Sequence, residues 1–461
     1  MSKNSKIITR FAPSPTGFLH IGGARTALFN YIFTKQKEGK IILRIEDTDI
    51  ERNREEFTEG IFDAFKWLKF EFDEVKKQSD NFEIHKKYLE KLITNGYAYI
   101  SKTDEKEIEE AKKEGKILRE EVIRFKNPNK IISFTDMIRG EISTDTTDLG
   151  DFVIAKSLNE PIFHLSNVVD DILMGVNHII RAEEHIANTP RQILIWEAIN
   201  ERERPIYGHI PLILSESKEK LSKRKHGEIV SIEYYKNNGY LKDAFINYLA
   251  FLGWNPGGEK EIYSLDEIIK IFDIKKVQKG GAVFNVDKLN WFNKEYIKTQ
   301  KEEEQIEYIK KFLPDIEKYN DELIQKLRPI IVDRISYYGE LRSMSERGEF
   351  SYFLEAPIFD SSSEEKDISK IIWKKSNREN TIENLILIKN ILENKEDDLE
   401  EAWKEIYSLA EEKGKGDVLW PLRYTLSGKE KSPDPKTLIN ILGMKKSINR
   451  INFSIKKLKN Y

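Results

Sequence analysis

Two hydrophobic periods follow one another at the start of the chain. Residues 7–11 form a short run of β-branched and aromatic residues, which is typical of a strand. Apolar residues then recur at helical spacing, so a helix is predicted to begin near Gly22 or Gly23. A second strand is predicted over residues 40–46. Strand, helix and strand over about forty residues predict a βαβ unit with parallel strands.

The pattern changes twice further along the chain. A charged helical run at residues 104–121, followed by short polar strands, predicts an insertion over residues 81–160. Apolar character returns at residues 161–164 and 176–181, where two more strands are predicted. From residue 231 the pattern is largely helical to the end. The chain is therefore predicted to combine an α/β part with an all-α part.

Length and composition narrow the class of protein. A chain of 461 residues is too long for one hydrophobic core. The net charge of −3 excludes a uniformly basic protein that coats nucleic acid, although a local basic face remains possible. The absence of cysteine excludes disulfides and thiolate metal sites. No membrane span and no secretory signal are expected, which fits a cytoplasmic enzyme.

The segment between the first strand and the first helix is rich in proline and glycine. Strand, glycine-rich turn and helix direct backbone N–H groups and the positive end of a helix at one spot, which is typical of a phosphate site. His20 lies on the approach to this spot. A tight turn with a structural histidine is the alternative. Because ligands bind beyond the carboxyl ends of parallel strands, Arg10, the His20 turn and Glu46 are expected to converge.

A basic loop far downstream is the second candidate for chemistry. Residues 218–227 read KEKLSKRKHG, with five lysine and arginine side chains and one serine. The default interpretation is a solvated surface loop. Such a loop could also stabilise a departing polyphosphate. No Walker-type phosphate loop occurs in the chain.

Together these two segments resemble the two signatures of class I aminoacyl-tRNA synthetases, HIGG at residues 20–23 and KLSKR at 220–224. Other stretches extend the resemblance over essentially the whole chain, and it is to bacterial-type glutamyl-tRNA synthetase. These stretches are residues 10–17, 44–49, 167–171, 180–185, 284–289, 421–423 and 427–430.

The resemblance implies a Rossmann-type α/β catalytic domain with an α+β insertion and an all-α C-terminal anticodon-binding region. Five parts are expected: the first half of the catalytic domain (1–80), an insertion that binds the tRNA acceptor end (81–160), the second half with the KLSKR loop (161–230), a helical stem-contact domain (231–315) and the anticodon-binding domain (316–461).

The implied activity joins L-glutamate to ATP and then moves the glutamyl group to the terminal adenosine of tRNA(Glu). ATP and Mg²⁺ are therefore expected, and a monomer without membrane contact is expected to carry out the reaction. By resemblance, three residues act in catalysis, with the lysines neutralising pyrophosphate: His20, Lys220 and Lys223. The residues expected to contact ATP are His20, Gly22, Gly23, His185, Ser222, Lys223 and Arg224.

Glutamate carries two carboxylates and one ammonium group, and the resemblance assigns a partner to each. Arg10 and Arg181 are the expected carboxylate binders, with Arg181 at the side-chain end. Glu46 is the expected partner of the ammonium group. The full expected pocket is Arg10, Ala12, Ser14, Glu46, Phe163, Asn167 and Arg181. A structural ion pair between Arg10 and Glu46 is the alternative.

The chain departs from the family pattern at three places. Many relatives have tyrosine where this chain has Phe163, and tryptophan where it has His185. Bacterial relatives often hold zinc through cysteines in the insertion, whereas Ser101 and Thr103 follow the Ala-Tyr pair here, so no zinc is expected. A metal site made by His178, Glu183, Glu184 and His185 is the alternative on composition.

Two other functions compete with this hypothesis. A glutaminyl-type synthetase shares the class I core, but its anticodon domains are β-barrels, whereas helices are predicted here after residue 315. A catalytically inactive tRNA-binding paralogue would be expected to have lost some of the signature residues. His20, Glu46, Arg181 and the KLSKR loop are all intact.

Overall fold

The computed structural model describes residues 6–49, 52–102, 119–359 and 368–461. It divides into two compact units, Met1–Tyr296 and Ile297–Tyr461. Most of the charged run predicted as a helix at residues 104–121 lies outside the described residues. The division into five parts stays a prediction.

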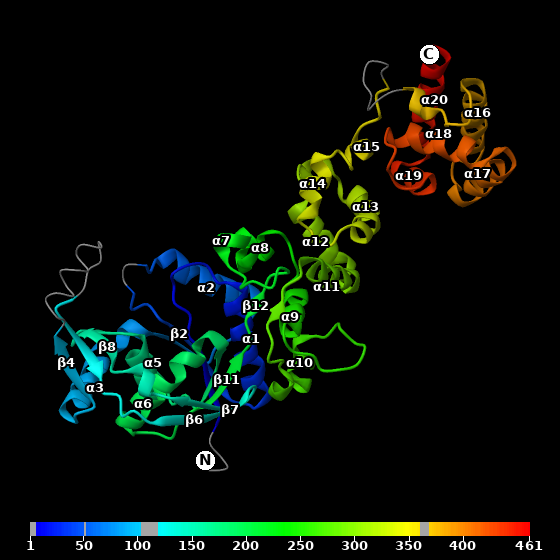
Figure 1. Cartoon of the computed structure of the whole chain (residues 1–461). Coiled ribbons are helices and arrows are strands. Elements are labelled where there is room, and N and C mark those ends of the chain that lie inside the picture. Colours follow the sequence, from blue (N-terminus) through cyan, green and yellow to red (C-terminus); the bar gives the residue numbers. More distant parts are fainter. Residues whose placement is uncertain (1–5, 50–51, 103–118, 360–367) are drawn as a thin grey trace. The chain divides into compact units, whose positions relative to one another are not determined.

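The predicted βαβ unit opens the first unit (Figure 1). Strand β1 (Ile8–Phe11) leads through α1 (Ile21–Gln36) to β2 (Lys40–Ile45), and the two strands pair in parallel. Helix α2 (Glu55–Leu68) then leads to β3 (Glu74–Lys77), which pairs in parallel with β2. Helix α1 is buried along most of its length, because other elements cover it on several sides.

A second sheet continues from the first across a short link. Strands β10 (His178–Ala182) and β11 (Ile206–Ile210) pair in parallel. The N–H of Asn177 donates to the carbonyl of Ile8 at 3.1 Å, so β10 lies beside β1. Parallel strands with helical crossovers confirm the predicted Rossmann-type architecture. Its carboxyl ends carry the candidate residues.

The strand predicted at residues 161–164 is wrong. Strand β9 covers only Glu160–Pro161, and helix α5 begins at Phe163 and runs to Leu173. A run of four apolar residues does not separate a strand from the first turn of a buried helix. Helix α5 packs against α6 (Thr189–Ile199), and this packing decides the outcome.

The insertion contains an antiparallel sheet and a hairpin. The sheet has the order β4 (Ala98–Lys102), β5 (Glu121–Phe125), β8 (Phe152–Ser157) and β9, with α3 (Phe82–Thr94) against it. The hairpin is formed by β6 (Ile131–Asp136) and β7 (Gly140–Asp145). Asp136, at the end of β6, pairs with Tyr207 of β11. The hairpin thus extends the catalytic sheet.

Helices dominate the rest of the first unit, as predicted. They are α7 (Lys223–His226), α8 (Ile232–Asn237), α9 (Lys242–Phe251), α10 (Leu265–Ile271) and most of α11 (Val286–Thr299), whose last residues follow the boundary at Tyr296. Strands β12 (Ile213–Leu214) and β13 (Ala282–Val283) pair in parallel. Helices α9 and α10 pack on α1, and the Gln36 side chain donates to two carbonyls at the end of α10.

The regular elements of the second unit are all helices within its described residues, which confirms the predicted all-α region. Its helices are α12 (Glu302–Phe312), α13 (Asp321–Arg334), α14 (Glu340–Glu346), α15 (Ser351–Leu354), α16 (Arg378–Asn394), α17 (Leu399–Lys413), α18 (Lys415–Ser427), α19 (Pro435–Leu442) and α20 (Met444–Lys459). Within the part of the chain that the structure describes, no helix has the length and apolar character that a membrane span needs.

Candidate active site

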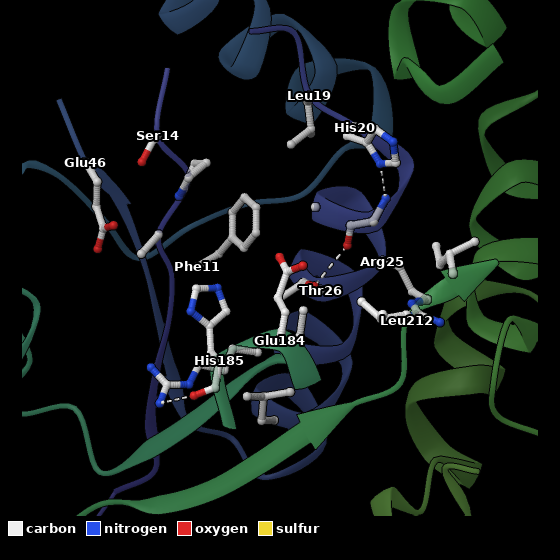
Figure 2. Close-up of a pocket in the computed structure, with 18 of the residues that line it drawn as sticks. Phe11, Ser14, Leu19, His20, Arg25, Thr26, Glu46, Glu184, His185 and Leu212 are labelled. Carbon is white, nitrogen blue, oxygen red and sulfur yellow. Dashed lines mark hydrogen bonds between the residues drawn. The ribbon is translucent and has the colours of Figure 1, made fainter. Parts of the chain in front are cut away.

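A cavity of about 750 Å³ opens at the carboxyl ends of β1, β2 and β10 (Figure 2). Every residue predicted for catalysis, glutamate or ATP lines it, with the exception of Arg224. In Figure 2 Ser14 and Glu46 lie on one side of the cavity and His20 on the other, with Glu184 and His185 between them. The two signatures therefore face one space, although about two hundred residues separate them.

His20 caps the first helix. Its Nδ1 accepts the N–H of Gly22 at 3.0 Å, and α1 begins at Ile21, one or two residues before the start predicted near Gly22 or Gly23. Burial, followed by the charge of Lys220, lowers the pKa of His20 below its ordinary value. The ring is therefore neutral near pH 7, as an Nδ1 acceptor requires. The Gly22 N–H, which was expected to face phosphate, is engaged by this cap.

Gly23 has a packing role as well as a position in the cavity wall. A Cβ atom there would lie 3.0 Å from the Leu19 side chain and 3.6 Å from Phe11. Residue 23 must be small because the loop before α1 folds back over the helix. The same absence of a side chain leaves backbone accessible from the cavity.

Arg10 is held by a buried carboxylate through its inner nitrogen, Nε. Its Nε donates to Asp171 at 3.2 Å. Both Nη groups lack partners among the described residues, and they belong to a side chain that lines the cavity. Although burial raises the pKa of Asp171, Arg10 and Arg44 hold it below its ordinary value, so the carboxylate stays ionised.

Glu46 is likewise held by hydrogen bonds to one side of its carboxylate. Its Oε1 accepts from Arg44 at 3.1 Å and from the Asn167 amide at 2.8 Å. Its Oε2 has no partner among the described residues and belongs to a cavity-lining side chain. Arg44 also contacts Asp171 at 2.6 Å, so Arg10, Asp171, Arg44 and Glu46 alternate in charge. The alternative pairing of Arg10 with Glu46 is not the one that these side chains adopt.

Arg181 differs from both neighbours, because its hydrogen-bond partners are all neutral. Its Nε donates to His209 at 3.2 Å, its Nη1 to Gln192 at 2.7 Å and its Nη2 to Thr189 at 2.8 Å. The side chain is 5% exposed, and no carboxylate pairs with it among the described residues. Burial, followed by the charge of Arg10, lowers the pKa of Arg181 to about 10, so it remains a cation near pH 7.

Phe163 and His185 form an aromatic wall. Their rings lie 5.8 Å apart and are tilted by 40°. Burial, followed by the charge of Arg181, lowers the pKa of His185 to about 4, so the ring is neutral near pH 7. The Asn188 amide and His185 Nδ1 lie within hydrogen-bond distance at 3.2 Å. A neutral aromatic surface is suited to stacking on a nucleobase.

The KLSKR loop brings its first four residues to the cavity. Lys220 forms an ion pair with Glu184, which projects into the same space. The Nζ of Lys223 lies 5.8 Å from the centre of the Phe18 ring. Ser222 is the residue before the one-turn helix α7, and Arg224 follows outside the cavity wall.

The alternative metal site is not assembled. Glu183 pairs with Arg139 and accepts the Leu212 N–H, while Glu184 pairs with Lys220. Throughout the described ranges, no group of three or more histidine, cysteine, aspartate or glutamate side chains is placed to hold a metal ion.

Comparison with known proteins accounts for both units. The family "tRNA synthetases class I (E and Q), catalytic domain" matches residues 6–120 and 109–291, and "Anticodon binding domain" matches residues 304–455. The chain belongs to the class I tRNA synthetases of the E and Q type. The predicted family resemblance and fold class are thereby confirmed.

Similar members of this synthetase family are glutamate–tRNA ligases. The chain is 38% identical to glutamate–tRNA ligase 1 of Helicobacter pylori strain HPAG1, over 98% of this chain and 100% of the relative. It is 42% identical to glutamate–tRNA ligase of Aquifex aeolicus, over 74% and 81%. A glutamate tRNA ligase from Elizabethkingia meningosepticum, solved in complex with its amino acid, matches 98% of this chain and 100% of its own, with 32% identity and a TM-score of 0.85.

Several residues of this synthetase site were missed in the sequence. Asp171 ends the recognised stretch 167–171, so motif position alone could have suggested it. Arg44 lies in a predicted strand and begins the recognised stretch 44–49, so its motif position could have suggested it as well. Asp136 and His209 lie 73 positions apart in ordinary strand sequences, and nothing in the sequence links them.

Proposed function

We propose that this synthetase is a glutamate–tRNA ligase that forms glutamyl-adenylate from L-glutamate and ATP and then charges tRNA(Glu). The observation that carries the proposal is Arg181, a buried guanidinium whose hydrogen-bond partners among the described residues are all neutral. It lines a cavity that also contains a carboxylate held by a second arginine. A buried cation without a counter-ion favours an anionic ligand. Glutamate, unlike glutamine, supplies a carboxylate at its side-chain end.

The three charges of glutamate match three side chains. Arg181 is proposed to bind the side-chain carboxylate, and the free Nη groups of Arg10 the other carboxylate. The free Oε2 of Glu46 is proposed to accept from the ammonium group. Ala12, Ser14, Phe163 and Asn167 complete the pocket wall. The hydrogen bonds that already hold Arg10, Glu46 and Arg181 reduce the side-chain entropy that these residues lose when glutamate binds.

ATP is proposed to occupy the half of the cavity between His20 and the KLSKR loop. A glutamate carboxylate oxygen bonds to the α-phosphorus, and the bond from that phosphorus to the bridging oxygen breaks, releasing pyrophosphate. Lys220 and Lys223 are proposed to stabilise the charge on that leaving group. Lys220 must first exchange Glu184 for phosphate oxygens. His185 is proposed to stack on the adenine, and Gly22, Gly23, Ser222 and Arg224 to contact ATP.

Mg²⁺ is proposed to arrive bound to the ATP phosphates. The cavity presents lysines and scattered carboxylates that are already paired, so the donor set fits a metal held by phosphate and water. The ion would neutralise phosphate charge when bound. In the second step, a hydroxyl of the terminal adenosine bonds to the glutamyl carbonyl carbon, its proton is lost, and AMP departs with the electron pair of the cleaved oxygen–carbon bond.

The second unit is proposed to bind the anticodon arm. A groove of about 730 Å³ lies among α13, α18 and α19. Four cations and three carboxylates line it, namely Lys326, Arg334, Arg423 and Lys431 with Asp333, Glu430 and Asp434. Arg423 lies 4.9 Å from the centre of the Trp420 ring and donates to the Glu430 carbonyl. Cations beside polar groups suit phosphates and unpaired bases. We further propose that the enzyme acts in the cytoplasm, where its tRNA substrate is used, and that it acts as a monomer.

An aminoacylation assay tests the proposal. The full-length protein is incubated with ATP, Mg²⁺ and tRNA(Glu), and with labelled glutamate or labelled glutamine. Label from glutamate alone is expected on the tRNA, and only when ATP is present. Label from glutamine would support a glutaminyl-type enzyme. The same tRNA preparations are shown to be chargeable with a known synthetase. If they then receive no label from either amino acid with this protein, the result would support an inactive paralogue.

A further inference from the structure

We propose that Asp136 and His209 are positioning residues for Arg181, and so set the preference for glutamate over glutamine. The inference rests on the proposed function, because it concerns the same amino-acid pocket. It goes further by assigning a part to the insertion hairpin, whose strand β6 contributes Asp136. Neither residue lines the cavity, so neither contacts the substrate directly.

The contacts form a chain of three side chains. His209 Nδ1 lies 2.7 Å from Asp136 Oδ2, and His209 Nε2 lies 3.2 Å from Arg181 Nε. The Thr189 hydroxyl, which can donate its hydrogen, also lies 3.2 Å from His209 Nε2. Asp136 is itself fixed, because its Oδ1 accepts the N–H groups of Ile138 and Arg139, both at 2.9 Å. The backbone N–H of His209 also donates to Asp136 Oδ2, at 3.0 Å. Both acid and imidazole side chains are fully buried.

The direction of these bonds determines the tautomer of His209. Arg181 Nε carries a hydrogen and has no lone pair to accept another, so His209 Nε2 must be the acceptor. The ring hydrogen therefore lies on Nδ1 and is donated to Asp136. A carboxylate accepts that hydrogen, whereas it could not donate to a bare Nδ1. Burial lowers the pKa of His209 even though Asp136 opposes the change, which keeps the ring neutral near pH 7.

Orientation matters here because Arg181 has no counter-ion to fix it among the described residues. The plane of the guanidinium is defined by Nε, Nη1 and Nη2, and the Nε contact anchors the end nearest the backbone. Gln192 and Thr189 hold the outer nitrogens. One Nη1 hydrogen remains without a partner in the described part of the chain, on a side chain that lines the cavity. Rotation of the plane would turn that donor away from a bound carboxylate.

Substitutions at His209 separate its two nitrogens. In His209→Gln the amide oxygen can reach the position of Nε2 and accept from Arg181. In His209→Asn the shorter amide reaches only the position of Nδ1 and contacts Asp136. His209→Gln loses the contact with Asp136, and His209→Asn loses the contacts of Nε2 with Arg181 and with the Thr189 hydroxyl. A purely structural role predicts a lower melting temperature in both variants, with no difference between them in the ratio of kcat/KM for glutamate over glutamine. A positioning role predicts that only His209→Asn loses the preference for glutamate.

Asp136→Asn inverts the tautomer. The oxygen of the introduced amide is expected to keep the backbone N–H groups of Ile138 and Arg139, because the opposite orientation would turn the NH₂ group toward both of these donors. The NH₂ group then faces His209 Nδ1 and the single backbone N–H of His209. The ring hydrogen must then move to Nε2, where it meets the Arg181 Nε–H. Two donors in contact displace the guanidinium. The expected loss in kcat/KM for glutamate is roughly ten- to a hundredfold, the size of one hydrogen bond to a charged group.

A second buried pair supplies the matched control. His85 Nε2 lies 2.8 Å from Asp170 Oδ1, both side chains are fully buried, and neither residue lines the cavity. His85→Asn is expected to lower the melting temperature as much as His209→Asn, while the ratio of kcat/KM for glutamate over glutamine stays at the parent value. The KM for ATP is expected to change little in any His209 variant, because the ATP half of the cavity is untouched.

The experiment combines kinetics with nitrogen NMR. Pyrophosphate exchange with glutamate and with glutamine is measured in the presence of tRNA for the full-length parent, His209→Gln, His209→Asn, Asp136→Asn and His85→Asn. Histidine is labelled with ¹⁵N, and the His209 signal is assigned from its loss in His209→Gln. The spectrum of the parent is expected to show hydrogen on Nδ1, and that of Asp136→Asn on Nε2.

Two results would overturn the inference. The first is an equal glutamate-to-glutamine ratio in His209→Gln and His209→Asn, and the second is hydrogen on Nε2 in the parent. If the parent shows hydrogen on Nδ1 but uses neither amino acid, the proposed function fails while the contact chain stands. If the parent uses glutamate and all variants keep its ratio, the positioning role fails while the function stands.

Discussion

Charge compensation differs among three arginines, of which Arg10 and Arg181 line the cavity and Arg44 lies behind its wall. Arg10 and Arg44 share Asp171, and Arg44 also contacts Glu46. Arg181 has hydrogen-bond partners without charge. Because a buried cation is costly without an anion, a bound carboxylate would offset part of the free-energy cost of burying Arg181. This difference supports the proposal that Arg181 binds the side-chain end of the substrate.

Lys223 offers a test at the scale of one residue. Lys223→Ala is expected to slow adenylate formation by about 10²–10³, because a charge that stabilises departing pyrophosphate is lost. Glutamate binding is expected to persist, since Lys223 contacts none of the pocket arginines. Single-turnover kinetics measure the step. Lys225→Ala is the matched control from the same loop, because Lys225 pairs with Glu219 and does not line the cavity. Equal rates for the two variants would contradict the assignment.

Some residues of the site could be predicted from the sequence and others could not. His20 and Lys220 were predictable because each lies in a signature whose spacing has a physical reason. Phe163 was predicted for the pocket but in the wrong element, since four apolar residues fit a strand or a helix equally well. His209 could not be predicted, because a lone histidine in a buried strand is ordinary and its partner lies on a hairpin 73 residues away.

Among the elements, the βαβ unit was the most predictable part and the insertion the least. For β1, α1 and β2 the hydrophobic period and the turn-forming residues predict the same elements that the structure contains. The β6–β7 hairpin was expected only as part of a polar insertion. Its junction with β11 depends on a long-range pairing that no local pattern encodes.

The insertion is expected to fold without zinc. Its core is built from aromatic and aliphatic side chains such as Phe125, Phe152 and Ile154, and the chain has no cysteine. Elemental analysis of a tag-free sample is expected to find no stoichiometric zinc, and a chelator is expected to leave the melting temperature unchanged. One zinc ion per chain would contradict this expectation.

The groove in the second unit gives a test of tRNA binding. Lys431→Ala, at an exposed cation of the groove, is expected to raise the KM for tRNA about three- to tenfold and to reduce its salt dependence by about one unit of log–log slope. The KM values for glutamate and ATP are expected to stay at the parent level. Lys404→Ala on α17, outside the groove, is the control. Equal effects of the two substitutions would remove the groove from the binding surface.

For the whole molecule, the sequence was sufficient to predict an α/β part followed by an all-α part. Both follow from the change of hydrophobic period and from motifs spread along the chain. The convergence of the motifs on one cavity follows from a general property of parallel sheets, whose ligands lie beyond the carboxyl ends of strands. Which charges pair inside that cavity is a matter of side-chain packing and needed the structure.

Acid is expected to destabilise the first unit before its carboxylates titrate. Burial lowers the pKa values of His164 and His185 to about 4 each, whereas both return to about 6.5 in the unfolded chain. Between these values the unfolded state binds more protons, so the free energy of unfolding falls as the pH is lowered through this window. Calorimetry is expected to show a lower melting temperature at about pH 5 than at about pH 7.

Replacement of both rings isolates this effect. A variant with His164→Asn and His185→Asn is expected to lose stability at both pH values but to show a smaller difference between them. An unchanged difference would assign the acid sensitivity to other groups.

The ratio of kcat/KM for glutamate over glutamine in Arg181→Gln, compared with the parent, tests the central claim most directly. Glutamine places an NH₂ group against donors that glutamate satisfies with a carboxylate, a mismatch of about 3–5 kcal/mol. Arg181→Gln is therefore expected to lower glutamate use severely, to change glutamine use much less, and to reduce the ratio roughly a hundredfold or more. A ratio that stays at the parent value would show that Arg181 does not read the side chain, and Arg10 would become the better candidate.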